Sequence, residues 1–232
     1  MDSFMQSLQS PRDSNIVVGN KTPETFFVQQ HLLERTSRYF VRALRNERLG
    51  EKTEPGVLRF PEDKPAVWKL LLFWMYKQEL PGEVFDHDLV PAVRTWALGD
   101  KLCIPAFQNH VMLAMVWYFR NKNITFRTLK AAVHSSLTGS PMRLLMAEEL
   151  VVSGAEFFSQ DALDELDGHQ FLSQVLQSQE QLSSYTRGLF GDGGIESLAE
   201  LNEYMVGEGL TEMNSARKIL RGAQCENVPP AT

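Results

Sequence analysis

Short runs of β-branched and aromatic residues mark the first part of the chain and predict strands. The run at 15–19 ends in glycine, and the run at 25–28 comes after turn-forming residues at 20–23, so the two predict a β-hairpin. A third run at 57–60 comes after a polar loop at 50–56 and predicts a third strand.

Helical spacing of apolar residues begins after the hairpin. Residues 31–45 predict two short helices, with Ser37 as the cap of the second. Further helices are predicted over 89–101 and from Pro105 to about residue 119. Because the strands come early and the helices cluster after them, the order predicts an α+β fold.

One predicted helix is apolar almost all round. It opens with Asp63 as the expected N-cap and Pro65 in the first turn, and it runs to Tyr76. A helix without a polar face is typical of a buried position, so we expect this helix to be central to the core.

The second half of the chain predicts four short helices, at 129–137, 142–152, 162–176 and 180–189. Asp161 is the expected cap of the third helix. After a glycine-rich linker at 191–194, the stripe of Leu198, Leu201, Tyr204 and Met205 predicts a marginal helix. Two interpretations stay open for that stripe: it docks on the body of the protein, or it recruits a partner.

Composition fits an intracellular protein. Of the 232 residues, 43% are hydrophobic, which is enough for a real core, and the two cysteines are too few for a disulfide framework. The first ten residues lack the pattern of a secretory signal, and the apolar stretches are shorter than the roughly 20 residues that cross a bilayer. We therefore expect a cytoplasmic or nuclear protein without membrane contact.

The two halves of the chain carry net charges of opposite sign. Residues 1–143 hold 19 Lys/Arg against 14 Asp/Glu, and residues 144–232 hold 4 against 15. The acidic half disfavours direct nucleic-acid binding. The basic cluster in the first half is read as a solvated helix face, with an anion or acidic-partner site as the alternative; it comprises Arg35, Arg38, Arg42, Arg45 and Arg48. The acidic cluster of the second half is read as a solvated face, with a surface for a basic partner as the alternative; it comprises Glu148, Glu149, Glu156, Asp161, Asp164, Glu165 and Asp167.

Catalytic chemistry has little support in the sequence. The five histidines are scattered without metal-ligand spacing; they are His31, His87, His110, His134 and His169. The Asp86-His87-Asp88 triplet is better explained by turn chemistry than by weak metal binding. The glycines at 191–194 come after no strand and precede no Lys-Ser/Thr, so they are no phosphate loop. We expect no catalytic residue, metal, cofactor or small-molecule substrate.

Residues spread in order over 14–119 resemble the BTB/POZ family. The resemblance is carried by Phe26, Val28, Leu33, Ser37, Tyr39, Phe40, Leu44, Leu58, Asp63, Phe73, Trp74, Tyr76, Ala97, Asp100, Lys101, Leu102, Ile104, Pro105, Gln108 and Asn109. Gln29-Gln30 stands where the family has a His-Lys pair. The stretch 137–146 is similar to the segment after the domain in short BTB proteins of fungi.

The resemblance implies a BTB/POZ fold, a small three-stranded sheet packed on a helical cluster, and a function in protein binding. Many family members are substrate adaptors that attach to the cullin scaffold of a ubiquitin ligase, partly through a hydrophobic-x-acidic motif before the third strand. Leu49 and Glu51 match this motif, with Phe40 and Leu44 as further candidate cullin contacts. A plain solvated loop is the alternative.

The expected organisation has four parts: an N-terminal segment at 1–13, a BTB/POZ domain at 14–120, a helical extension at 121–190 and a flexible acidic tail with marginal helices at 191–232. The first segment, with Phe4, Met5 and Leu8, is either a dimer-exchange segment, as the resemblance implies, or a frayed terminus. The alternative to a cullin adaptor is a homo-oligomerising scaffold or a transcription-associated BTB protein without a ligase role.

Overall fold

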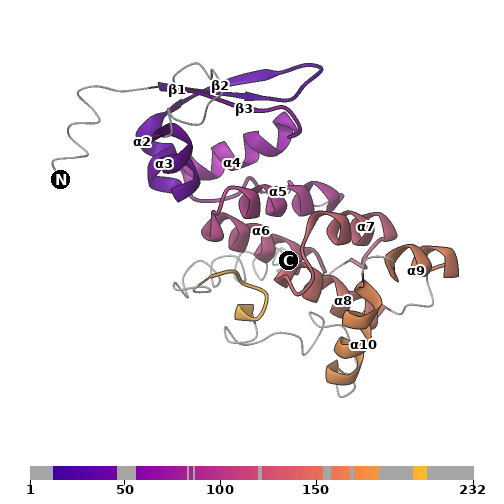
Figure 1. Cartoon of the computed structure of the whole chain (residues 1–232). Coiled ribbons are helices and arrows are strands. Elements are labelled where there is room, and N and C mark those ends of the chain that lie inside the picture. Colours follow the sequence, from indigo (N-terminus) through magenta and orange to yellow (C-terminus); the bar gives the residue numbers. More distant parts are fainter. Residues whose placement is uncertain are drawn as a thin grey trace, which may run out of the picture. The chain divides into compact units, whose positions relative to one another are not determined.

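A three-stranded mixed sheet forms in the first part of the chain (Figure 1). The computed structural model describes residues 13–45, 56–82, 84–85, 87–119, 122–153, 158–167, 170–182 and 201–207. Strand β1 (Asp13–Val18) pairs antiparallel with β2 (Glu24–Gln29) and parallel with β3 (Val57–Phe60), which gives the order β2-β1-β3. The predicted hairpin and third strand are confirmed.

The two faces of the sheet differ in burial, as strand alternation requires. Ile16 and Val18 of β1 are completely buried, and the side chain between them in sequence is only partly buried. The hairpin turn begins at Gly19, whose φ of 92° is a left-handed conformation that a glycine adopts without strain.

Nine helices lie in the described residues, so the α+β class is as predicted. The predicted pair at 31–45 is confirmed as two separate helices. The bounds are α2 (Gln30–Thr36), α3 (Arg38–Arg45), α4 (Pro65–Lys77), α5 (Val90–Lys101), α6 (Pro105–Phe119), α7 (Phe126–Ser135), α8 (Pro141–Ser153), α9 (Gln160–Asp167) and α10 (Phe171–Leu182). No helix of the described part is long and apolar enough to span a membrane.

The predicted helix starts are correct in one case and wrong in another. The Ser37 hydroxyl accepts a hydrogen bond from the Tyr39 amide at 2.9 Å, so Ser37 caps α3 as predicted. Asp63 is not the N-cap of α4; that position is Lys64, which makes no side-chain cap bond. The Asp63 carboxylate instead accepts from the Trp68 indole at 3.0 Å, inside the helix that it was expected to cap.

The second half departs from prediction at one break. The helix predicted over 162–176 is two helices, α9 and α10, and Gln170 between them has a left-handed φ of 58°. Asp161 does not cap α9: the Ser159 hydroxyl accepts from the Ala162 amide at 3.3 Å. Most of the helix predicted at 180–189 lies outside the described residues, and its first residues belong to α10.

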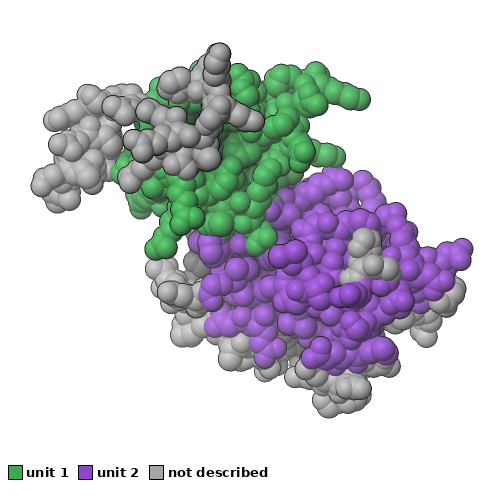
Figure 2. All heavy atoms as spheres, in the orientation of Figure 1, with its two compact units in different colours: residues 1–81, 98–104 green, residues 82–97, 105–232 purple. Residues whose placement is uncertain are grey.

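The chain divides into two compact units (Figure 2). Unit 1 comprises Met1–Pro81 and Leu98–Ile104, and unit 2 comprises Gly82–Ala97 and Pro105–Thr232. The four-part organisation expected from the sequence stays a prediction.

The two units have different cores. In unit 1, the Trp68 ring lies 4.5 Å from that of Phe60 and 6.4 Å from that of Phe40, measured between centroids. The core of unit 2 is built from helix side chains, among them Phe107, Met112, Met115, Leu145, Met146 and Phe171.

Candidate interaction sites

Most of the residues proposed from the sequence as partner contacts lie outside the described part of the chain: Leu49, Glu51, Phe4, Met5 and Leu8. Of the remaining two, Leu44 is half-buried near the end of α3. Phe40 is completely buried, with its ring edge-on to Tyr39 at 5.5 Å. A direct contact of Phe40 with a partner therefore disagrees with its position, because the ring is part of the core.

One face of α4 is apolar and exposed, although the helix contributes much of the core of unit 1, as expected. Phe73 is 38% exposed and Tyr76 is 59% exposed. With Lys69 they share one stripe at positions i, i+4 and i+7. Lys69 Nζ lies 2.8 Å from Glu24 Oε2, which links this stripe to β2. The helix thus presents two aromatic side chains beside a surface ion pair.

A second exposed aromatic site lies on the sheet itself. Phe27 of β2 is 74% exposed, the largest exposed fraction among the aromatic side chains of unit 1 that the structure describes. Strand alternation places Phe27 on the opposite face from Glu24 and the buried Val28. Because β2 is an outer strand of the described sheet, the exposed Phe27 lies at an edge of that sheet.

Polar contacts inside unit 1 join the start of α3 to the turn after α5. The Ser37 hydroxyl donates to the Leu102 carbonyl and lies 3.4 Å from the Cys103 carbonyl oxygen. In the same unit, Lys101 Nζ donates to Asp63 at 2.8 Å and lies 5.4 Å from the Phe60 ring centroid. Residues that are 65 positions apart in the chain are thereby held together.

In unit 2, residues 201–207 pack against the helical body. Leu201, Tyr204 and Met205 are buried. The Asn109 side chain donates to the Val206 carbonyl at 3.2 Å and accepts from the Val206 amide at 2.8 Å. Of the two interpretations left open for this stripe, docking on the body is therefore observed. Residues 201–207 belong to the tail that the sequence predicted to be flexible, and here they are packed.

Buried carboxyl groups lie on α8, where the sequence suggested a solvated acidic face. Glu148 is 5% exposed and accepts a hydrogen bond from the Tyr204 hydroxyl, and Glu149 is 3% exposed. Burial, reinforced by the neighbouring Glu148, raises the pKa of Glu149 to about 8. Burial also raises the pKa of Glu148, although the Tyr204 hydrogen bond opposes that shift. The solvated-face prediction is wrong for these two residues, because α8 turns them inward.

The third buried ionic group of α8 has a structural role. The Arg143 guanidinium donates to the Val133 carbonyl at 2.7 Å and to the Ser136 carbonyl at 3.1 Å. These carbonyls belong to the last turn of α7 and the residue after it, where a helix leaves acceptors unpaired. Arg143 therefore closes the end of α7.

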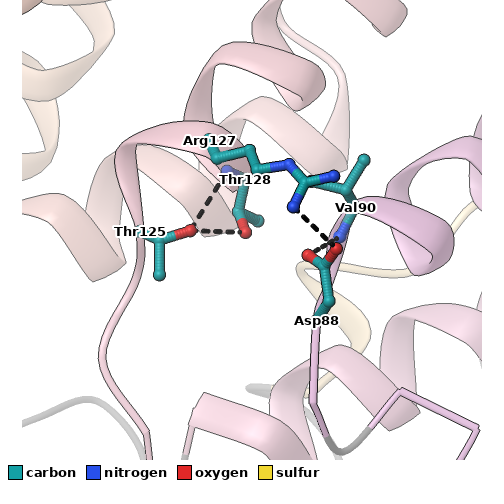
Figure 3. A network of polar contacts seen from close by, with 5 residues as sticks. All are labelled: Asp88, Val90, Thr125, Arg127 and Thr128. Atoms are coloured by element: carbon teal, nitrogen blue, oxygen red, sulfur yellow. Dashed lines mark hydrogen bonds and ion pairs between the residues drawn. The ribbon is translucent and has the colours of Figure 1, made fainter.

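Asp88 shows what the Asp86-His87-Asp88 triplet does. One oxygen of Asp88 accepts from the amide of Val90, the first residue of α5, at 2.9 Å, and the other lies 3.5 Å from Arg127 of α7 (Figure 3). In the same network the Thr125 hydroxyl accepts from the Thr128 amide and caps α7. In the part of the chain that the structure describes, no three His, Cys, Asp or Glu side chains are grouped to hold a metal ion.

No protein-family model matches this chain, and no curated protein matches it in sequence. A functional proposal for the chain therefore rests on its own residues and their geometry.

Proposed function

We propose that this chain is a BTB/POZ protein that acts as a non-enzymatic protein-interaction module in the cytoplasm or nucleus. The observation that carries the proposal is the exposure of three large aromatic side chains on unit 1, Phe27, Phe73 and Tyr76. Aromatic residues are enriched in protein interfaces, where they supply much contact area at little entropic cost. Two of the three lie on one stripe of α4, which makes a continuous surface.

The family assignment is supported by how unit 1 uses the residues that resemble the family. Ser37, Asp63 and Lys101 come from three separate parts of the sequence, and each contacts another residue of the resemblance. The three-stranded sheet and the helices after it agree with the α+β architecture that the resemblance implies.

The finer function that we propose is that of a substrate adaptor for a cullin-RING ubiquitin ligase. Leu49 and Glu51 lie between α3 and β3 in the sequence. The half-buried Leu44 is near the end of α3, shortly before them in the chain. An apolar side chain that fills a pocket, with a carboxylate at its rim, combines an anchor with a directional contact.

The test is light scattering of the full chain mixed with a cullin N-terminal fragment. A complex is expected at tens of micromolar, and the double variant Leu49→Ala/Glu51→Ala is expected to weaken it about tenfold or more, since a truncated anchor often costs over 1 kcal/mol. Lys52→Ala, next to Glu51 in the sequence, is the matched control and is expected to bind like the wild type. Absence of any complex from the wild type would contradict the adaptor function.

A homo-oligomerising scaffold is the second candidate function, and the exposed stripe of α4 favours it. If Phe73 and Tyr76 contact a second copy, the wild type is a dimer and Phe73→Ser/Tyr76→Ser is a monomer by light scattering. Lys77→Ser, which is exposed on the same helix, is the control. A wild type that stays monomeric at high concentration would contradict self-association.

A further inference from the structure

We propose that α6 and α8 of unit 2 form a peptide-binding site that residues 201–207 occupy in cis. The proposed partner is a protein segment with the same pattern: an apolar residue, tyrosine three positions later, two apolar residues after it, and glycine. This inference concerns unit 2 and does not depend on the cullin or on the exposed residues of unit 1.

The site binds the main chain of its occupant through the side chain of Asn109. Asn109 of α6 is 4% exposed, and its amide pairs with both the N–H and the C=O of Val206. The same two bonds would hold any non-proline residue in this backbone conformation, since neither involves the Val206 side chain. Asn109 therefore holds a peptide backbone in place without restricting sequence at that position.

Specificity comes from the tyrosine. The Tyr204 hydroxyl donates to Glu148 of α8, and the Tyr204 side chain is 3% exposed. A phenylalanine in its place would leave the buried Glu148 without this donor, which is costly in a desolvated site. The site thus distinguishes tyrosine from the other aromatic residues.

The occupant binds as one tight turn and a short tail that ends in glycine. The Tyr204 amide bonds to the Leu201 carbonyl at 3.2 Å, so one turn brings Leu201, Tyr204 and Met205 to the same face. Gly207 then has a left-handed φ of 72°, which glycine adopts without strain and other residues rarely adopt. Glycine at the end of the pattern is therefore part of what the site accepts.

The chain's own segment is an imperfect ligand for this site. Glu203 is exposed, and its charge helps to raise the pKa of the buried Glu148. The Glu203 carboxylate repels the charged form of Glu148, whereas a lysine or a neutral residue at this position would not. A partner segment without the acidic residue before its tyrosine is thus expected to bind more tightly than the cis segment.

Covalent connection compensates for this defect. The 18 residues 183–200 join α10 to the docked segment, and a tether of this kind gives an effective concentration of about 1 mM. A free peptide at micromolar concentration therefore competes poorly unless its intrinsic affinity is higher. The cis segment acts as a plug that only a better-matched partner displaces.

The experiment measures binding of two fluorescent nine-residue peptides to the full chain by anisotropy. One peptide has the sequence of residues 200–208, and the other carries lysine in place of the glutamate of position 203. The receptors are the wild type, Leu201→Ser/Tyr204→Ser, whose own segment no longer fits, and the same variant with Asn109→Ala.

The peptides are expected to bind the Leu201→Ser/Tyr204→Ser chain at least tenfold more tightly than the wild type, and Asn109→Ala is expected to remove this gain. The lysine peptide is expected to bind more tightly than the native one, with a difference that shrinks as salt is added. Equal binding to wild type and variant, or indifference to Asn109→Ala, would overturn the proposal.

A second measurement uses the wild type alone, so it tests the proposal even if the variants fail to fold. In the wild type, excess lysine peptide should accelerate hydrogen exchange of the Val206 amide, which Asn109 protects. An unchanged exchange rate at saturating peptide would overturn the proposal. Failure in either assay leaves the cullin test on Leu49 and Glu51 unaffected, so the two proposals are judged separately.

Discussion

The interiors of the two units differ in where they keep ionisable groups. In unit 1 the centre is aromatic, and the Asp63–Lys101 pair retains contact with water, with side chains 16% and 44% exposed. In unit 2 the adjacent Glu148 and Glu149 are almost completely buried on one helix. Burying a carboxyl group favours its neutral form and so makes the free energy of unfolding depend on pH. The stability of this protein should therefore depend on pH through unit 2.

The largest expected effect is the pH dependence that Glu149 produces. Its folded-state pKa of about 8 lies above the ordinary value of 4.5, so the folded state retains a proton that the unfolded state loses. Stability is therefore fully present below about pH 4.5 and is lost as the pH rises through 8, by up to about 5 kcal/mol at 1.36 kcal/mol per unit. Urea denaturation from pH 5 to pH 9 measures this loss.

Glu149→Gln is the control for that prediction, because it removes the titrating group and nearly preserves its shape. The variant should have a much flatter profile, with the remaining slope due to Glu148, whose pKa is also raised. A wild type whose free energy of unfolding is constant between pH 5 and pH 8 would contradict the difference between the units.

The next effect tests the aromatic core of unit 1. Trp68→Ala should cost about 3–5 kcal/mol, because loss of the completely buried indole leaves a large cavity. Phe73→Ala on the same helix is the matched control and should cost far less, since its ring is 38% exposed. Thermal denaturation measures both variants, and equal losses would mean that α4 is buried on both faces.

A smaller effect is expected from the polar contacts of unit 1. Ser37→Ala should cost about 1–3 kcal/mol, because it removes the cap of α3 and leaves the buried Leu102 carbonyl without this donor. Ser135→Ala, at an exposed helical position, should stay within about 0.5 kcal/mol of the wild type. Chemical denaturation at one pH compares the pair.

The sequence predicted the elements of unit 1 well, because local signals define them. The glycine after β1, the cap at Ser37 and the proline at the start of α4 each act within a few residues. The exposure of Phe73 and Tyr76 was not predicted, since a helix that is apolar all round has no periodicity that distinguishes its buried face from its exposed one. That distinction depends on which other elements pack against the helix.

Less of unit 2 could be predicted. Non-glycine residues rarely adopt a positive φ, so Gln170 gave no local signal for the break between α9 and α10. The site for residues 201–207 depends on Asn109, which is 97 positions from Val206, and on Glu148, which is 56 positions from Tyr204. An acidic run on a helix is usually solvated, and only the packing of α8 shows that two of its members are not.

The parallel pairing of β1 with β3 has a consequence for synthesis on the ribosome. The β1–β2 hairpin can close as soon as residue 29 has emerged, but the other side of β1 finds its partner only when residues 57–60 are available. Non-local pairings of this kind slow folding, because the entropy of closing a long loop is lost before the stabilising hydrogen bonds form. Until then one edge of β1 has unpaired backbone groups, which can pair with another chain, so the nascent protein is open to aggregation during this interval.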